Sequence, residues 1–192
     1  MVNIVCLGLN HRVAPVEVRE RYHFGDEEVR QALLRLKAAG VKESVVVSTC
    51  NRTELYYVTS PGAPPEREVW DLLAAGRDGA GTSSWPHVYA IRSLRAAQHL
   101  FKLASGIDSM VLGDIQIMNQ IKSAYALAQD CRSAGAILNK LFPMALHAGK
   151  RARTETEVAD GAVSIGYARA CRSEASRCSW DQVSGACCRC RC

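Results

Sequence analysis

The stretch that decides the fold is Val45-Val46-Val47-Ser48-Thr49-Cys50-Asn51-Arg52-Thr53-Glu54. Its three β-branched valines predict a short buried strand, and the run Leu55-Tyr56-Tyr57-Val58 predicts a second one. The thiolate is the reactive form of a cysteine, and a neighbouring cation such as Arg52 favours it, so Cys50 is a candidate nucleophile. The alternative is a small buried core residue, a common fate of free cysteine. The polar neighbours of Cys50 favour the first interpretation.

Length and composition predict a globular protein. The chain has 192 residues, of which 48% are hydrophobic and 22% charged, which suits one domain with an extension. No apolar run reaches membrane-spanning length, and the first residues lack the basic region of a signal peptide, so a cytoplasmic protein is expected. Of the net charge of +5, residues 169–192 contribute +3. The remaining +2 does not by itself indicate nucleic-acid binding by the body of the chain.

Strands and helices alternate on either side of the opening stretch. Strands are predicted at residues 3–9 and 87–91, and Asp26 is the predicted N-cap of a helix that ends near Gly40. Further helices are predicted at residues 16–22, 66–73, 94–104, from an Asp114 cap to about 128, and 136–153. Pro143 should kink or split the last of them. This order predicts an α+β fold in which helices pack on a sheet.

The end of the chain differs in composition from the rest. Cys6, Cys50 and Cys131 are spread through the body, as in a reduced cytosolic protein, whereas the other six cysteines lie in residues 171–192. Residues 169–192 contain no Leu, Ile, Phe or Met and have no strand or helix period, so they are predicted to be disordered. We interpret this segment as the translation of a GC-rich gene out of frame, after a frameshift. The alternative, a thiolate metal site, lacks two separated Cys-x-x-Cys pairs, and no metal ligands are predicted.

Motifs spread over residues 1 to about 167 resemble one known family. They are Gly8-Leu9-Asn10-His11 with Ala14-Pro15, Ser48 to Glu54, Ser105-Gly106, Ser109 to Gly113, Gln116-Ile117, Gln120, Lys122, Ala124-Tyr125, Gly149-Lys150-Arg151, Arg153 to Thr156 and Gly161 to Ser164. In this order they resemble the N-terminal catalytic domain of glutamyl-tRNA reductase, an enzyme of tetrapyrrole (porphyrin and haem) biosynthesis. The resemblance implies a ferredoxin-like arrangement of sheet and helices, which the predicted elements allow.

The resemblance also implies a chemistry. The family's cysteine, here Cys50, attacks the ester that joins glutamate to tRNA and leaves the glutamate on the enzyme as a thioester. NADPH then delivers a hydride and releases glutamate-1-semialdehyde. A thiol suits this sequence because it divides one difficult step into two. His99 matches a histidine that the family needs near the cysteine, although a histidine at this helical position is otherwise most often a surface or half-buried residue.

A second set of residues is implied to hold the glutamyl group: Thr49, Asn51, Arg52, Ser109, Asp114, Ile115, Gln116 and Gln120. Arg52 suits a carboxylate because its planar guanidinium can bind both oxygens, and its alternative role is a surface ion pair. Gln116 and Gln120 lie one helical turn apart, and they could equally form a solvated helix face.

The sequence departs from the family pattern in three places. Asp114-Ile115 stands where the family has Glu-Pro, Pro143 is unexpected, and no strand is followed by Gly-x-Gly-x-x-Gly, the turn that binds a dinucleotide. We therefore expect a catalytic domain at residues 1–154, the start of a linker at 155–168 and an aberrant tail at 169–192. The NADPH-binding and dimerisation domains of the family are not expected in this sequence.

Because a site for NADPH is not expected, the expected activity is at most the acyl-transfer half of the reaction, after which water can hydrolyse the thioester. Glutamyl-tRNA is the expected partner. The family's homodimer, and contact with the next enzyme of the pathway, an aminomutase, are implied by resemblance only. Two alternatives are a catalytically inactive fragment that serves as an RNA-binding or interaction module of the same fold, and a general cysteine hydrolase that uses Cys50 and His99.

Overall fold

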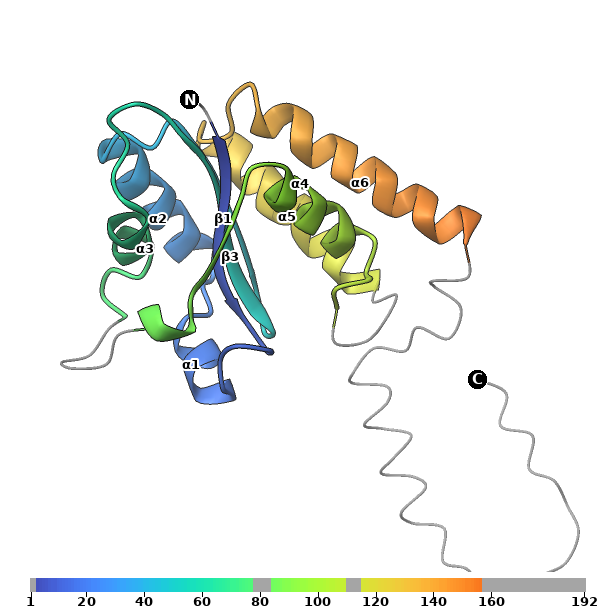
Figure 1. Ribbon diagram of the computed structural model, residues 1–192, viewed down its shortest axis with the longest axis horizontal. Helices are drawn as coiled ribbons and strands as arrows, with labels where there is room; N and C mark the ends of the chain where they lie inside the picture. Colours follow the sequence, from blue (N-terminus) through green and yellow to red (C-terminus); the bar gives the residue numbers. More distant parts are fainter. Residues whose placement is uncertain (1–2, 78–83, 110–114, 157–192) are drawn as a thin grey trace, which may run out of the picture. The chain divides into compact units, whose positions relative to one another are not determined.

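The computed structural model describes residues 3–77, 84–109 and 115–156. A four-stranded antiparallel sheet is formed by β1 (Asn3–Asn10), β2 (Glu43–Thr49), β3 (Arg52–Thr59) and β4 (Tyr89–Arg92), in the order β2-β3-β1-β4. One face of the sheet is covered by α2 (Asp26–Ala38) and α3 (Glu66–Leu73), and the other by α4 (Leu94–Ala104), α5 (Ile115–Asp130) and α6 (Leu138–Glu155), as Figure 1 shows. The short helix α1 (Val16–Arg21) lies at one end of the sheet.

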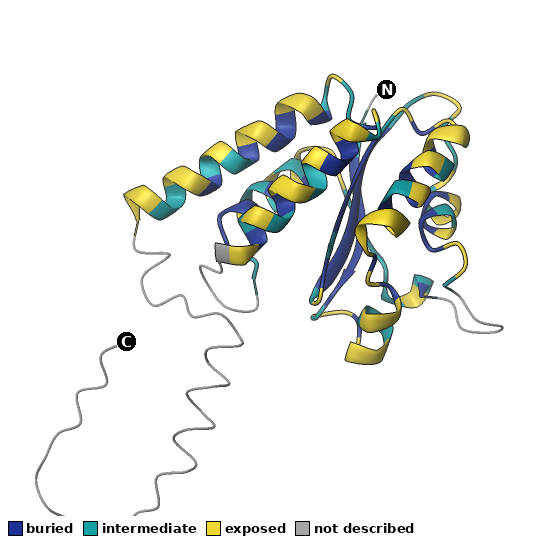
Figure 2. Ribbon diagram, turned by 180° about the vertical axis from the view of Figure 1, so that it is seen from behind, coloured by how far each residue is buried: buried dark blue, intermediate teal, exposed yellow. Residues whose placement is uncertain are grey.

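The order of elements confirms the predicted α+β, ferredoxin-like fold followed by helices. The strands alternate with α2 and α3 on one face, and the helices that come after β4 cover the second face. The sheet therefore lies between two helical layers. Strands β1, β2 and β3 are mostly buried and the edge strand β4 is only partly buried, while the outer sides of the helices are exposed (Figure 2). Polar side chains on either face of the central strands are thus shielded from water.

Strand β3 carries different chemistry on its two faces because side chains alternate along a strand. Toward α4 it presents Arg52, Glu54 and Tyr56; the Tyr56 ring meets Phe142 of α6 edge-on, with ring centroids 5.6 Å apart. On the opposite face, the Thr53 hydroxyl donates to the carbonyl of Tyr22 at 2.6 Å. A buried strand with an ionic face is unusual, and the candidate site is built on it.

Two predicted boundaries at helix α2 and strand β4 were wrong. Gly25, not Asp26, is the N-cap of α2, because the Glu28 carboxylate accepts the Gly25 N–H at 2.8 Å and leaves Asp26 as the first helical residue. His87 belongs to a single 3-10 turn, Trp85–His87, so the strand begins two residues later than predicted, at Tyr89.

Helix α6 starts two residues later than predicted and is not split. The Glu43 carboxylate of β2 accepts the N–H groups of Ile137 and Leu138 at 3.1 and 2.8 Å, and this contact fixes the helix start. Pro143 lies on the exposed side of the helix, as does Asn139, whose carbonyl loses its helical partner. Water can hydrogen-bond to that carbonyl, so one helix continues through the proline.

The predicted disordered tail, its frameshift interpretation and its alternative as a metal site concern residues 169–192, which lie outside the described residues. The same holds for Asp114 and its predicted capping role. No helix in the described parts of the chain is both long enough and apolar enough to cross a membrane.

Candidate active site

Cys50 lies in the tight turn that joins β2 to β3. Thr49 pairs with Arg52 across the hairpin, so Cys50 and Asn51 form a two-residue loop. The Thr49 hydroxyl accepts the N–H groups of Asn51 and Arg52, both at 3.2 Å. The Cys50 thiol is free and exposed, so its alternative interpretation as a buried core residue is wrong.

Two neighbouring elements hold this loop. Arg19 of α1 donates from one guanidinium nitrogen to the carbonyl of Cys50 and to the side-chain oxygen of Asn51, each at 3.0 Å. The backbone N–H of His11, just beyond β1, donates to the carbonyl of Asn51 at 3.0 Å. The backbone of the nucleophile candidate is therefore held from two sides, while its side chain faces solvent.

Arg52 is a buried cation, with only 2% of its side chain exposed, so its alternative as a surface ion pair is wrong. Its Nη1 donates to Glu54 Oε1 at 2.8 Å and to Asp108 Oδ2 at 3.1 Å, and its Nη2 donates to the carbonyl of Asp108. Arg12 binds the other Asp108 oxygen at 3.0 Å. Burial alone would lower the pKa of Arg52, but Glu54, Tyr89 and Asp108 outweigh it and raise the pKa, so the guanidinium stays charged.

His99 enters the same cluster from α4. Its Nε2 lies 3.0 Å from Glu54 Oε1, and its Nδ1 lies 3.8 Å from Asp108 Oδ2. The ring stacks on Tyr56 and meets Tyr89 edge-on, with ring centroids 6.4 and 6.1 Å apart. The structure therefore brings Arg52 and His99 onto one oxygen of Glu54, although they are far apart in the sequence.

The remaining predicted site residues lie on the segment after α4 and in α5. Ser109 follows Asp108 directly, and its hydroxyl oxygen is buried without a hydrogen-bond partner among the described residues. In α5, Gln116 is exposed and Gln120 half-buried. Ile115 is the first residue of α5, and Asp114 is not described. Helix α5 lies on the side of the sheet that α4, the helix of His99, covers (Figure 1).

Sequence reasoning assigned no role to Glu54, Tyr89 or Asp108, which connect the cluster. A signal was available for Glu54: it stands two residues after Arg52 in a strand, so the two opposite charges share one face. No comparable signal marks Tyr89 or Asp108, because their partners lie on other elements of the chain.

Comparison with known proteins agrees with these observations. Residues 7–156 match the family model described as "Glutamyl-tRNAGlu reductase, N-terminal domain". The chain belongs to this family. The resemblance seen in the sequence motifs is therefore confirmed.

Relatives of known name cover the same region. Over 168 residues the chain is 41% identical to glutamyl-tRNA reductase of Geobacillus thermodenitrificans and 40% identical to that of Trichodesmium erythraeum; each match covers 87% of this chain, and 37% and 39% of the respective relative. The solved glutamyl-tRNA reductase from Methanopyrus kandleri is 34% identical, with a TM-score of 0.69, over 90% of this chain and 39% of that one. The chain thus spans less than two-fifths of the length of these relatives.

One trio in the described part of this glutamyl-tRNA reductase domain has the spacing of a metal site. Ligand atoms of Cys6, Glu54 and His99 lie within 4.8 Å of one another. The set does not fit a cation, because both oxygens of Glu54 already accept hydrogen bonds and the Arg52 guanidinium lies 2.8 Å away. Burial, and then Glu54, raise the pKa of the Cys6 thiol, which keeps it protonated and a poor ligand.

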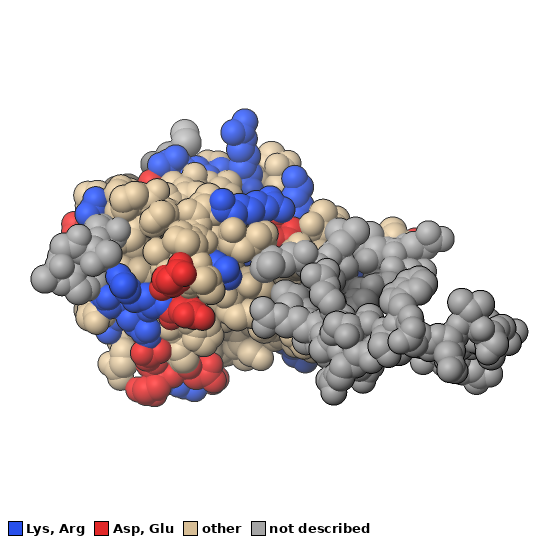
Figure 3. Space-filling view, turned by 90° about the horizontal axis from the view of Figure 1, so that it is seen from below, with Lys and Arg blue, Asp and Glu red and all other residues tan. Residues whose placement is uncertain are grey.

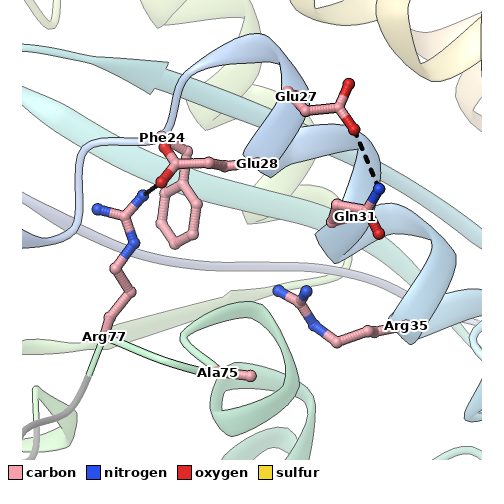
Figure 4. A pocket seen from close by; sticks show the side chains of 7 residues that line it. All are labelled: Phe24, Glu27, Glu28, Gln31, Arg35, Ala75 and Arg77. Carbon is pink, nitrogen blue, oxygen red and sulfur yellow. Dashed lines mark hydrogen bonds and ion pairs between the residues drawn. The ribbon is translucent and has the colours of Figure 1, made fainter.

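A separate pocket of about 250 Å³ lies between α2 and the segment that follows α3, on the opposite face of the sheet (Figure 4). It is lined by Phe24, Glu27, Glu28, Gln31, Arg35, Ala75 and Arg77, and contains no predicted site residue. Its charged groups have partners within the chain: Arg77 pairs with Glu28, Gln31 donates to Glu27 at 3.0 Å, and Arg35 donates to the carbonyl of Leu72 at 3.1 Å.

Surface charge at the end of the domain where α1 lies is mixed. Figure 3 views the molecule from this end, and Lys and Arg side chains are interspersed with Asp and Glu over its described part. This agrees with the small net charge of the body of the chain. Cations such as Arg19 lie beside Cys50 as individual side chains, and the described part of this end has no broad basic surface.

Proposed function

We propose that this domain carries out the acyl-transfer step of glutamyl-tRNA reduction. Cys50 Sγ attacks the carbonyl carbon of the ester between glutamate and tRNA. The Sγ–C bond forms, the C–O bond to the ribose breaks, and the thiol proton passes to the ribose oxygen of the released tRNA. The observation that carries this proposal is an exposed thiol on a rigid two-residue loop, next to a buried network that contains Arg52 and His99.

His99 is proposed as the acid–base group of this step, which takes the thiol proton and returns it to the leaving oxygen. Support comes from its half-buried position and from its ring nitrogens: one is held by Glu54, and the other lies toward Asp108.

Arg52 is proposed to bind the side-chain carboxylate of the glutamyl group. Its guanidinium already accommodates carboxylate oxygens of Glu54 and Asp108, so its surroundings suit this chemistry. Thr49, Asn51, Ser109, Asp114, Ile115, Gln116 and Gln120 remain proposed contacts of the substrate. Thr49 and Asn51 also have local roles. The Thr49 hydroxyl oxygen accepts the N–H of Asn51 within the turn, and the Asn51 side-chain oxygen accepts a hydrogen bond from Arg19.

NADPH is the proposed hydride donor of the complete enzyme, but the described residues do not fit it. Their strands are all antiparallel, whereas a dinucleotide typically binds at the ends of parallel strands. In the pocket on the α2 side of the sheet, Glu27 and Glu28 balance the charges of Arg35 and Arg77, and both arginines already have partners within the chain. We therefore assign no step of the reduction to these residues.

Other partners and the cellular setting are also proposals. The domain acts on glutamyl-tRNA; a homodimer and contact with an aminomutase are proposed from family resemblance. A cytoplasmic setting is supported by the three free cysteines of the described residues, because a reducing compartment keeps thiols free.

The test is to incubate the chain with glutamyl-tRNA and follow loss of the aminoacyl ester, with and without NADPH. We expect deacylation through an enzyme thioester, trapped by acid quench and mass spectrometry on the peptide that contains Cys50. Cys50→Ser should abolish it, whereas Cys131→Ser, at a half-buried thiol on another element, should not. Deacylation that survives Cys50→Ser would refute the nucleophile assignment, and semialdehyde made by this chain alone would refute the restriction to acyl transfer.

Alkylation separates catalysis from the alternative of an inactive RNA-binding module. A catalytic Cys50 should react rapidly with iodoacetamide and be protected by glutamyl-tRNA but not by uncharged tRNA. Slow alkylation, or equal protection by both RNAs, would favour the binding module.

A further inference from the structure

The Glu54 carboxylate is fully buried and receives hydrogen bonds from four elements of the fold. Oε1 accepts from Arg52 Nη1 at 2.8 Å and Tyr89 Oη at 2.6 Å, and lies 3.0 Å from His99 Nε2. Oε2 accepts from Tyr56 Oη at 2.7 Å and from the Cys6 thiol of β1 at 4.0 Å. The side chain has no exposed surface. Glu54 therefore joins β1, β3, β4 and α4 at one point.

These donors keep Glu54 ionised. Burial by itself raises the pKa of a glutamate, but the hydrogen bond from His99 and the charge of Arg52 outweigh it, so the pKa of Glu54 lies well below its ordinary value of 4.5. Burial and the neighbouring Glu54 raise the pKa of both Tyr56 and Tyr89, so their hydroxyl groups remain protonated donors. An ionised carboxylate can only accept hydrogen bonds.

The consequence for His99 follows from this chemistry. Because Glu54 only accepts, the proton of a neutral His99 ring must lie on Nε2, which faces Oε1. The lone pair then lies on Nδ1, the nitrogen that points toward Asp108. A single tautomer is thus selected, and Nδ1 becomes the proton acceptor of the ring.

A purely stabilising role explains this arrangement poorly. Buried ionic groups contribute little net stability because their desolvation offsets their attraction, and apolar side chains would fill the same space without this cost. The sheet also makes room for the carboxylate at Gly8 of β1, which pairs with Glu54. A Cβ added at Gly8 would lie 2.8 Å from Glu54 Cγ and 3.1 Å from Tyr89 Oη.

We propose that Glu54 is a positioning residue, which Tyr56, Tyr89 and Arg52 hold in place so that it fixes His99 in the Nε2–H tautomer and directs Nδ1 to proton transfer. This inference rests on the proposed acyl-transfer function for its kinetic consequence. The tautomer itself can be measured without any activity, so the failure of one proposal can be told from the failure of the other.

The first measurement is the tautomer of His99 in the unmodified full chain. Long-range ¹H–¹⁵N spectroscopy, recorded at a pH at which the spectra show a neutral ring, shows which ring nitrogen carries the proton. The signals of His99 are assigned by their loss in His99→Gln. We expect the Nε2–H form alone, and the Nδ1–H form or a mixture of the two would overturn the proposal.

The second measurement uses Glu54→Gln, which keeps the shape of the side chain but lets it donate as well as accept. We expect a mixture of tautomers and single-turnover deacylation slower by at least ~100-fold, the lower range of acid–base catalysis, at an unchanged affinity for glutamyl-tRNA. Tyr57→Phe, on the opposite face of β3, is the matched control and should change neither readout. An unchanged tautomer in folded Glu54→Gln, or a rate loss no larger than the loss of folded protein, would refute the positioning role.

Discussion

The buried ion pair between Arg52 and Glu54 allows a direct test of how burial changes the contribution of an Arg–Glu ion pair to the free energy of unfolding. Arg52→Met removes a guanidinium that is 2% exposed and bonded to Glu54 and Asp108. Removing one partner of a buried pair costs about 3–5 kcal/mol. Because Glu54 keeps its contacts with Tyr56, Tyr89 and His99, we expect a loss at the low end, about 3 kcal/mol.

Arg92→Met provides the control, since Arg92 forms a comparable ion pair with Glu66 but is 58% exposed. An exposed pair contributes about 0–1 kcal/mol because water screens both charges, so the identical substitution should have little effect there. Urea unfolding of both variants, followed by the fluorescence of the buried Trp70 and by circular dichroism, gives the two free energies of unfolding. With a slope of about 2 kcal/mol/M, the Arg52 variant should unfold at a urea concentration lower by about 1.5 M. A loss of unfolding free energy in Arg52→Met no larger than in Arg92→Met would refute the argument that burial makes the contribution of the Arg52–Glu54 pair large.

Two further predictions concern the ionisation of Glu54 and the packing of α6 on α4. The pKa of Glu54 is lowered on folding, so its ionised form stabilises the fold at a pH above its ordinary pKa of 4.5, and this contribution is lost as the pH falls below that value. Urea titrations at pH 7 and pH 3 should therefore show a smaller acid-induced loss of unfolding free energy in Glu54→Gln than in the unmodified chain. Equal losses in the two proteins would contradict this. Gly149→Ala should lower the melting temperature although alanine favours helices by about 1 kcal/mol, because the new Cβ on α6 would meet the Ala104 carbonyl oxygen and lie 2.7 Å from its carbon. Lys150→Ala, on the exposed side of α6, is the control for helix propensity, and a Gly149→Ala melting temperature equal to or above that of the unmodified chain would contradict the clash.

The parts of the fold that could be predicted from the sequence are those set by local patterns. The valines before Cys50 and the Leu55-Tyr56-Tyr57-Val58 run predicted both strands of the hairpin, and the family motifs supplied the ferredoxin-like arrangement. Boundaries set by distant residues were missed. The start of α6 depends on Glu43, which lies 95 residues before Leu138.

The candidate site divides in the same way. Thr49, Cys50, Asn51 and Arg52 are neighbours in the sequence, and one hairpin brings them together. The link from Arg52 to His99 could not be predicted, because it requires Glu54 to meet a histidine 45 residues away and a tyrosine 35 residues away. The burial of Arg52 was missed for the same reason, since the groups that neutralise it come partly from another segment.

The alternation of side chains along β3 also constrains where residues can be inserted into or deleted from the chain. Inserting a single residue between Arg52 and Thr53 would exchange the two faces of the rest of the strand, turning Thr53 toward α4 and the Glu54 carboxylate toward the helix layer that contains α2. The two-residue loop at Cys50 has no spare chain with which to absorb such a shift. The distance in sequence from the thiol to the buried carboxylate is therefore fixed, whereas the loop at residues 60–65, which joins β3 to α3 on the surface, can gain or lose residues while the sheet keeps its register.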